Sequence, residues 1–225
     1  MYHLIKRLFD IIASLSALVV LFPLLGPIMI GLKLTGEGHI FYFQKRIGYK
    51  NQPFDIWKFA TMLLDSPNMK GGYITLRDDP RVTPMGGFLR KTKINELPQI
   101  FNVLIGTMSV VGPRPLAQVT YDTYPSEAKE KVYNRKPGIT GIGSIIFRDE
   151  ERMMSSVKDE PMEFYKNHIA PYKAALELWY GANASIVIDL KIIILTVWVI
   201  IFPKSELPYS WLKGLPKMPQ ALENI

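Results

Sequence analysis

An apolar segment near the amino terminus constrains this chain more than any other feature. Residues 8–34 carry only two charges, Asp10 and Lys33, and the run contains Pro23 and Pro27. The stretch before Pro23 amounts to about 14 residues, or about 21 Å of helix, which is shorter than the roughly 30 Å hydrocarbon core of a bilayer. Proline removes a helical hydrogen bond and bends the axis, so we expect the helix to break near Pro23.

The charges beside this segment indicate how it lies. Lys6 and Arg7 precede it, and further basic residues follow it. Because basic residues favour the cytoplasmic side of a membrane, these flanks favour a re-entrant hairpin that enters the membrane and returns to the same face. A kinked single span and a pair of buried helices in a soluble core are the alternatives. The long run without a small-residue cleavage site is not typical of a signal peptide.

Composition narrows the possible chemistry. The chain has 225 residues, 48% of them hydrophobic and none of them cysteine, which excludes a disordered chain, disulfides, thiolate metal sites and cysteine nucleophiles. His3, His39 and His168 are scattered, which argues against a multi-histidine metal site. The net charge of +7 suits an anionic membrane surface, phosphorylated substrates or nucleic acid. No base-reading motif or interleaved basic–aromatic platform occurs, so nucleic acid is not an expected partner.

Residues 36–183 have the composition of a compact α+β body. Aromatic and β-branched residues between turn signals predict strands over residues 41–43 and 54–59, with turns over 36–38 and 49–53. Further loops are expected over residues 65–72 and 78–81, and a short helix over 171–180 whose aromatic stripe is more typical of a core than of a ligand site.

The segment 93–104 gives the first indication of a site. Proline is tolerated only in the first turn of a helix, so Pro98 predicts a helix that begins with Asn95 as its N-cap. Glu96 would then lie at a helix N-terminus, where free N–H groups favour an anion, with basic residues before and after it in the sequence. A carboxylate among cations suits phosphoryl transfer, although a glutamate in the first turn is commonly ordinary helix electrostatics.

A series of short segments then matches one known family. In order they are Lys6–Asp10, Phe43–Gly48, Lys58–Met62, Asp79–Thr83, Gly87–Thr92, Glu96–Gln99, Asn102–Leu104, Met108–Pro115 and Lys136–Gly141. Any one of them would be a weak signal. Together, from about residue 5 to 200, they resemble the bacterial sugar transferase family, the monotopic phosphoglycosyl transferases.

The resemblance implies transfer of a phospho-sugar from a UDP-sugar to polyprenyl (undecaprenyl) phosphate, with release of UMP. This is the initiating step of glycoconjugate or exopolysaccharide assembly at the cytoplasmic face of the bacterial inner membrane. It also implies Mg²⁺, contact with membrane lipids, a re-entrant helix, and an Asp-Glu pair before Leu-Pro-Gln in which the Asp attacks phosphorus and the Glu assists the metal. A homodimer, or contact with downstream glycosyltransferases, stays open.

The chain departs from the family at the expected nucleophile. The family's Asp falls on Asn95, whose neutral carboxamide is a poor nucleophile, and Ala60 and Thr107 replace a family Arg and a family acid. Several accounts fit. Glu96 is the nucleophile and Asp149 or Glu150 helps to hold Mg²⁺, or the lipid phosphate attacks directly. The other accounts are an engineered substitution and a catalytically silent scaffold that binds nucleotide sugar.

The resemblance also carries over a set of site residues. We expect Glu96 and Asn95 at the catalytic centre and Glu96 and Asp149 at the metal. Arginine suits bidentate recognition of phosphate, and lysine supplies a further point charge. The residues expected to bind substrate are Arg114, Arg90, Arg148, Lys58 and Arg81. For Arg114 the alternative is a purely structural arginine in a rigid turn, and for Arg81 an ordinary Asp79–Arg81 turn.

Residues 184–225 extend the membrane interpretation. The run 192–202 is too short to span a bilayer, so we expect an interfacial helix followed by a basic tail, with a buried packing helix as the alternative. The predicted fold is therefore a mainly helical α+β catalytic body with short strands over residues 36–183. A re-entrant membrane hairpin over 1–35 precedes it, and the interfacial segment over 184–225 follows.

Overall fold

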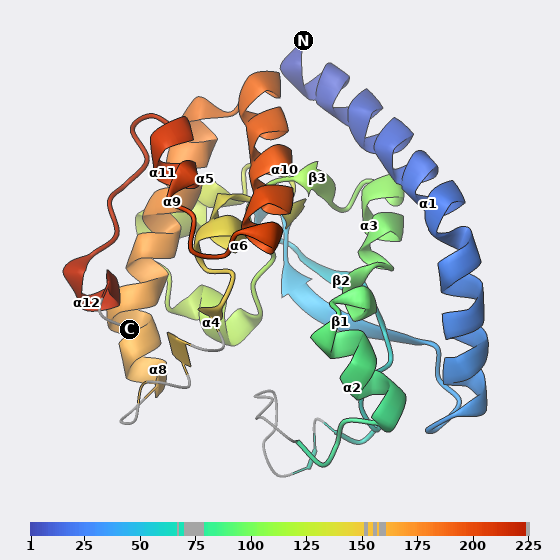
Figure 1. Cartoon of the computed structure of the whole chain (residues 1–225). Helices are drawn as coiled ribbons and strands as arrows, with labels where there is room; N and C mark the ends of the chain where they lie inside the picture. The colour runs from blue at the N-terminus through green and yellow to red at the C-terminus, as the bar shows by residue number, and fades with distance from the viewer. Residues whose placement is uncertain (67, 70–78, 151–152, 155–156, 158–160, 224–225) are drawn as a thin grey trace.

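One long helix and a group of C-terminal helices enclose two small sheets (Figure 1). The computed structural model describes the chain except residues 67, 70–78, 151–152, 155–156, 158–160 and 224–225. The loops expected over 65–72 and 78–81 therefore lie partly outside the described residues. Helix α1 (Tyr2–Leu34) runs along one side, and α9 (Ala170–Asn183) and α10 (Ile186–Ile201) lie on the other.

Helix α1 continues through both prolines, so the break expected at Pro23 is absent and no hairpin of two helices forms. Pro23 and Pro27 lie on the exposed side of the helix. The bend that they cause appears as a gradual curvature around the body (Figure 1), and Leu25, Ile28 and Leu32 remain buried against it. By length and composition α1 could cross a membrane.

The first turns of α1 are held by polar contacts with distant parts of the chain. Asp10, which is 2% exposed, accepts hydrogen bonds from the Ser109 hydroxyl at 3.0 Å and the Val110 N–H at 2.9 Å. Arg7 donates to carbonyls at the end of α3 (Gln99–Ile105), and Lys6 forms an ion pair with Asp189 of α10 at 2.7 Å. The basic residues expected to set membrane topology thus also join α1 to α3 and α10.

The first sheet is an antiparallel hairpin that confirms both predicted strands. Strand β1 (Phe41–Ile47) pairs with β2 (Pro53–Phe59) across a turn that contains η1 (Tyr49–Asn51). In the second sheet β3 (Ser109–Val111) pairs in parallel with β4 (Gly138–Thr140).

The predicted helix over 93–104 begins later than expected, and Asn95 is not its N-cap. Residues Ile94–Glu96 form a 3-10 turn, η2, and α3 (Gln99–Ile105) starts after Pro98. Pro98 has no N–H, so it cannot make the bond that would continue an α-helix from η2. Instead Leu97 N–H bonds back to the Ile94 carbonyl, three residues earlier. Gly106, with φ of 90°, closes α3.

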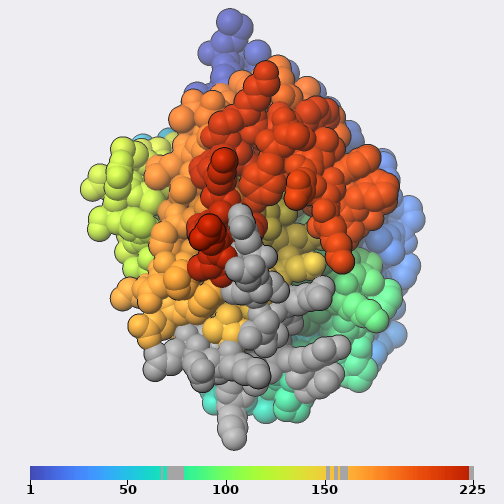
Figure 2. Space-filling view, turned by 60° about the vertical axis from the view of Figure 1, so that its left-hand side comes forward, coloured from blue at the N-terminus to red at the C-terminus, as the bar shows by residue number. Residues whose placement is uncertain are grey.

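The main core lies among the C-terminal helices, and Figure 2 shows the face that they cover. The aromatic stripe of α9 is buried there, since Tyr172, Leu176 and Tyr180 are at most 4% exposed, which confirms the core interpretation. The remaining elements are α2 (Pro84–Lys91), α4 (Gln118–Asp122), α5 (Ser126–Val132), α6 (Ile142–Ile146), α8 (Pro161–Phe164), η3 (Tyr165–Ile169), α11 (Leu207–Trp211) and α12 (Gln220–Glu223).

Helix α10 packs on the core, as the second alternative expected, and the interfacial position stays a prediction. Ile192, Leu195 and Val199 are buried in the core, as a packing helix requires. Ile194 and Val197, on the other side, are more than half exposed. The division of the chain into segments 1–35, 36–183 and 184–225 stays a prediction.

Candidate active site

One face of the β1–β2 hairpin supplies the cations of the site. Tyr42 pairs with Lys58, Gln44 with Ile56, and Arg46 with Phe54. Directly paired residues of an antiparallel sheet share a face, so Gln44, Arg46 and Lys58 project to the same side. Gln44 accepts two hydrogen bonds from Arg46, at 3.2 Å from Nε and 2.7 Å from the terminal nitrogen, which fixes that guanidinium.

Glu96, on η2, faces these cations. Its Oε1 lies 3.5 Å from Nζ of Lys58. Burial favours a raised pKa for Glu96, but the charges of Lys58, Arg114 and Lys93 more than offset it, so the pKa lies below the usual range. Burial lowers the pKa of Lys58 to about 8, because the attraction of Glu96 compensates only in part. Near pH 7 the site therefore holds an ionised carboxylate beside a protonated lysine.

Arg114 completes this cluster from the Gly112–Pro115 turn. Its charge is close enough to Arg46 to help burial lower the pKa of that guanidinium. A narrow pocket lies where these side chains meet. It is lined by Arg46, Ile56, Lys58, Glu96, Gln99, Arg114, Pro115, Gly138 and Ile139. Three cations around one carboxylate form a site for an anion with several charged oxygens, such as a diphosphate.

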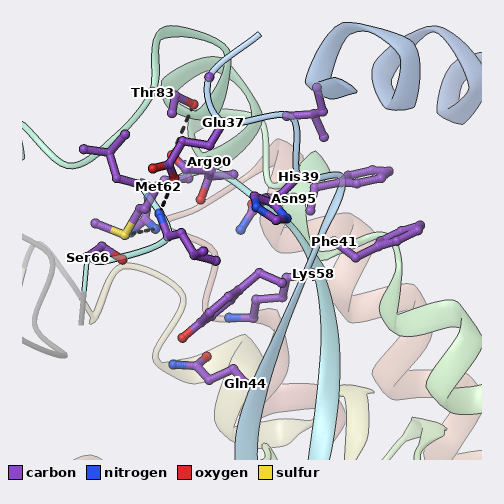
Figure 3. Close-up of a pocket in the computed structure, with 18 of the residues that line it drawn as sticks. Glu37, His39, Phe41, Gln44, Lys58, Met62, Ser66, Thr83, Arg90 and Asn95 are labelled. Carbon is purple, nitrogen blue, oxygen red and sulfur yellow. Dashed lines mark hydrogen bonds between the residues drawn. The ribbon is translucent and has the colours of Figure 1, made fainter. Parts of the chain in front are cut away.

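A wide pocket adjoins the narrow one, and Arg46 and Lys58 line both. It encloses about 1140 Å³, including space open to solvent. Lys58 and Gln44 reach into it from the hairpin, and Arg90 and Asn95 line its other sides (Figure 3). Asn95 is 8% exposed, and its Oδ1 has no hydrogen-bond partner among the residues that the structure describes. A buried acceptor left free at a pocket wall is available to a ligand.

Comparison with known proteins identifies the family of the chain. Residues 1–203 match the family described as bacterial sugar transferase. The chain belongs to this family. The exopolysaccharide production protein PSS of Rhizobium leguminosarum bv. phaseoli is 36% identical over 199 residues, which are 86% of this chain and 93% of that protein.

Two longer relatives have names that state a reaction. The undecaprenyl-phosphate glucose phosphotransferase of Komagataeibacter xylinus is 37% identical over 205 residues, 89% of this chain and 36% of its own length. The UDP-glucose:undecaprenyl-phosphate glucose-1-phosphate transferase of Klebsiella pneumoniae is 38% identical over 196 residues, 86% of this chain and 39% of its own length. This sugar transferase thus spans well under half of each of these two relatives.

The structure gathers five of the predicted substrate and catalytic residues and separates others. Lys58, Glu96, Arg90 and Asn95 line the two pockets together with Arg114. Arg148 and Asp149 are exposed and line neither pocket.

Arg81 also lies outside both pockets. It is 1% exposed and is held by Asp79 through contacts of 2.6 and 2.9 Å, with a further bond to the Ser66 carbonyl at 2.8 Å. The sequence offered an ordinary Asp79–Arg81 turn as the alternative to substrate binding, and the structure adds an ion pair between the two residues.

Two residues of the site were missed by sequence reasoning. Arg46 lies in the Phe43–Gly48 segment that carried the family resemblance, and its alternation with Gln44 could have indicated it. Glu177, on α9, accepts a hydrogen bond from the Arg114 backbone N–H at 3.4 Å. No local sequence pattern indicated Glu177, because its hydrogen bond joins residues 63 positions apart.

The donor atoms at the pockets fit the magnesium ion that the family implies. Mg²⁺ prefers oxygen ligands and is commonly held by one or two carboxylates together with substrate phosphates. Glu96 supplies a carboxylate and Asn95 an unpartnered, buried carboxamide oxygen. Within the described part of the chain, no group of three or more His, Asp or Glu residues is placed to hold a metal ion.

Proposed function

We propose that this chain transfers a sugar phosphate from a UDP-sugar to undecaprenyl phosphate, releasing UMP, in the assembly of an extracellular polysaccharide. The observation that carries the proposal is the placement of Lys58, Arg46 and Arg114 around Glu96, where the two pockets adjoin. The names of the relatives support the same acceptor lipid and product class.

The residues of the narrow pocket suit the diphosphate of the donor. Lys58, Arg46 and Arg114 bind its oxygens and stabilise the charge that moves onto the leaving UMP. Glu96 and Asn95 would hold Mg²⁺, which supplies further neutralisation of the phosphate charge when it is bound. The wide pocket then accommodates the sugar.

The transfer proceeds by direct displacement. Asn95 cannot attack phosphorus, and the lowered pKa of Glu96 marks a carboxylate that is stabilised by cations and is correspondingly weak as a nucleophile. An oxygen of the lipid phosphate therefore attacks the phosphorus next to the sugar. The bond from that phosphorus to the oxygen bridging the two phosphates breaks, and its electron pair leaves with UMP.

Two exposed apolar surfaces support attachment to the membrane that holds the lipid. Leu8, Ile12 and Val19 of α1 are exposed, and so are Ile194 and Val197 of α10. We place α1 in the bilayer of the bacterial inner membrane and α10 at its surface, with the pockets facing the cytoplasm, where UDP-sugars are made.

The test is release of UMP from a panel of UDP-sugars by protein in detergent, with Mg²⁺, with and without undecaprenyl phosphate. We expect release only when the lipid is present, none from Glu96→Gln, and a lipid-independent burst from Asn95→Asp, which restores a carboxylate nucleophile. A lipid-independent burst from the unaltered chain would refute direct displacement. Binding of UDP-sugar without any turnover would refute the enzyme and favour the silent scaffold.

A further inference from the structure

The backbone of Arg114 is held at both of its polar groups. The Tyr133 hydroxyl donates to the Arg114 carbonyl at 2.7 Å, and the Arg114 N–H donates to Oε1 of Glu177 at 3.4 Å. Pro113 and Pro115 fix the backbone angles on either side. Arg114 is therefore presented to the narrow pocket from a turn with little freedom.

Glu177 is an unusual group for the place that it occupies. It is 4% exposed, in the main core, and its Oε2 has no hydrogen-bond partner among the described residues. Gly143, at the start of α6, approaches so closely that a Cβ there would lie 2.6 Å from Oε1 of Glu177. The backbone N–H of Gly143 also stabilises the charged form of this carboxylate. A buried carboxylate without a full set of partners is costly, and packing alone would be better served by an apolar side chain.

The groups that face Glu177 do not neutralise it fully. Lys173, one turn earlier on α9, donates to Glu150 at 2.6 Å and only attracts Glu177 from a distance. Arg114 attracts it as well, while Tyr124 and Tyr133 lie near it as neutral phenols. Burial outweighs these attractions and raises the pKa of Glu177 to about 7.

We propose that Glu177, together with Tyr133, is a positioning residue that holds the Arg114 guanidinium beside Glu96 and Lys58 for donor binding. Glu177 does not touch the substrate in this account. It acts through the backbone of Arg114. The inference rests on the proposed function only for the measurements of turnover, because donor binding can be measured without transfer.

The matched test is Glu177→Gln, which keeps the shape but offers a neutral and weaker acceptor. We expect KM for UDP-glucose to rise about 10-fold with kcat changed less than about 2-fold, because one charge-assisted hydrogen bond weakens. Since the ionised carboxylate is the better acceptor, KM of the unaltered protein should fall as pH rises from 6 to 8. That dependence should be absent from the Gln variant. Glu163→Gln, an exposed carboxylate on α8, is the control and should match the unaltered protein.

A second variant and a binding assay keep the inference testable in every case. Tyr133→Phe removes the other anchor and should also raise KM. Titration calorimetry with UDP-glucose, without lipid, should show weaker binding by both variants even if no transfer occurs, so failure of the proposed function can be recognised separately. Unchanged donor affinity in both variants, or a change in thermal midpoint without a change in affinity, would show that Glu177 is merely structural and would overturn the inference.

Discussion

The carboxyl group of Glu177 should make the stability of this protein fall as pH rises. Its pKa is raised from 4.5 to about 7 by burial in the core. A carboxyl group whose pKa is higher in the folded state binds more protons there than in the unfolded chain. Its favourable contribution is complete below pH 4.5 and is lost as the pH rises through 7. Glu177→Gln, which cannot ionise, should remove this part of the pH dependence.

The size of the effect follows from the two pKa values. Each unit of pKa difference corresponds to 1.36 kcal/mol, so the ionisation of Glu177 should lower the free energy of unfolding by about 2.5 kcal/mol between pH 5 and pH 8. Since Glu177 is fully buried, no large reduction for solvent screening applies. For a chain of this length about 2.5 kcal/mol corresponds to roughly 5–10 °C in thermal midpoint.

The assay is thermal unfolding in one detergent, followed by the fluorescence of the four tryptophans from pH 5 to pH 8. The difference in midpoint between Glu177→Gln and the unaltered protein should grow in favour of the variant as the pH rises. Parallel pH curves for the two proteins would refute the reasoning, since they would show that Glu177 does not titrate in this range.

Three further predictions concern other residues of the structure. Burial lowers the pKa of Lys58 to about 8, so donor affinity should decline above pH 8 as its charge is lost, and Lys58→Arg, which stays charged, should abolish that decline in a calorimetric titration. Arg81→Lys loses the two-point contact with Asp79 and should lower the thermal midpoint by several degrees with KM unchanged; a raised KM with an unchanged midpoint would instead return Arg81 to the site. Asp10→Ala leaves the Ser109 hydroxyl and Val110 N–H without their acceptor, and should cost about 1–3 kcal/mol in a denaturant titration; a loss below about 0.5 kcal/mol would contradict the anchoring of α1.

The parts of the fold that follow local rules could be predicted. The aromatic run around Trp57 indicated a strand, and the apolar spacing of Tyr172, Leu176 and Tyr180 indicated a buried helix face. Lys58 and Glu96 could be proposed as site residues because each begins a segment that carries the family resemblance, which needs no knowledge of the fold.

The parts of the fold that depend on tertiary packing could not be predicted from the sequence. The prolines of α1 predicted a break, but the helix is continuous and curved. Its buried residues pack around Phe59 and Leu89, and the sequence of α1 alone does not contain that packing. The start of α3 was misplaced because the 3-10 turn before Pro98 has almost the same local signals as a helix N-terminus. Glu177 was missed because its partner is a backbone N–H far away in the sequence.

The most direct test of the central claim follows one phosphorus atom. The protein would be incubated with undecaprenyl phosphate, Mg²⁺ and a UDP-sugar carrying ³²P in the phosphate next to the sugar, using the sugar that releases UMP. Transfer of a sugar phosphate predicts that the label moves into the lipid fraction with the sugar, and that Glu96→Gln prevents this. Label that stays in UDP while sugar reaches the lipid, or label that never leaves the intact donor, would contradict the account.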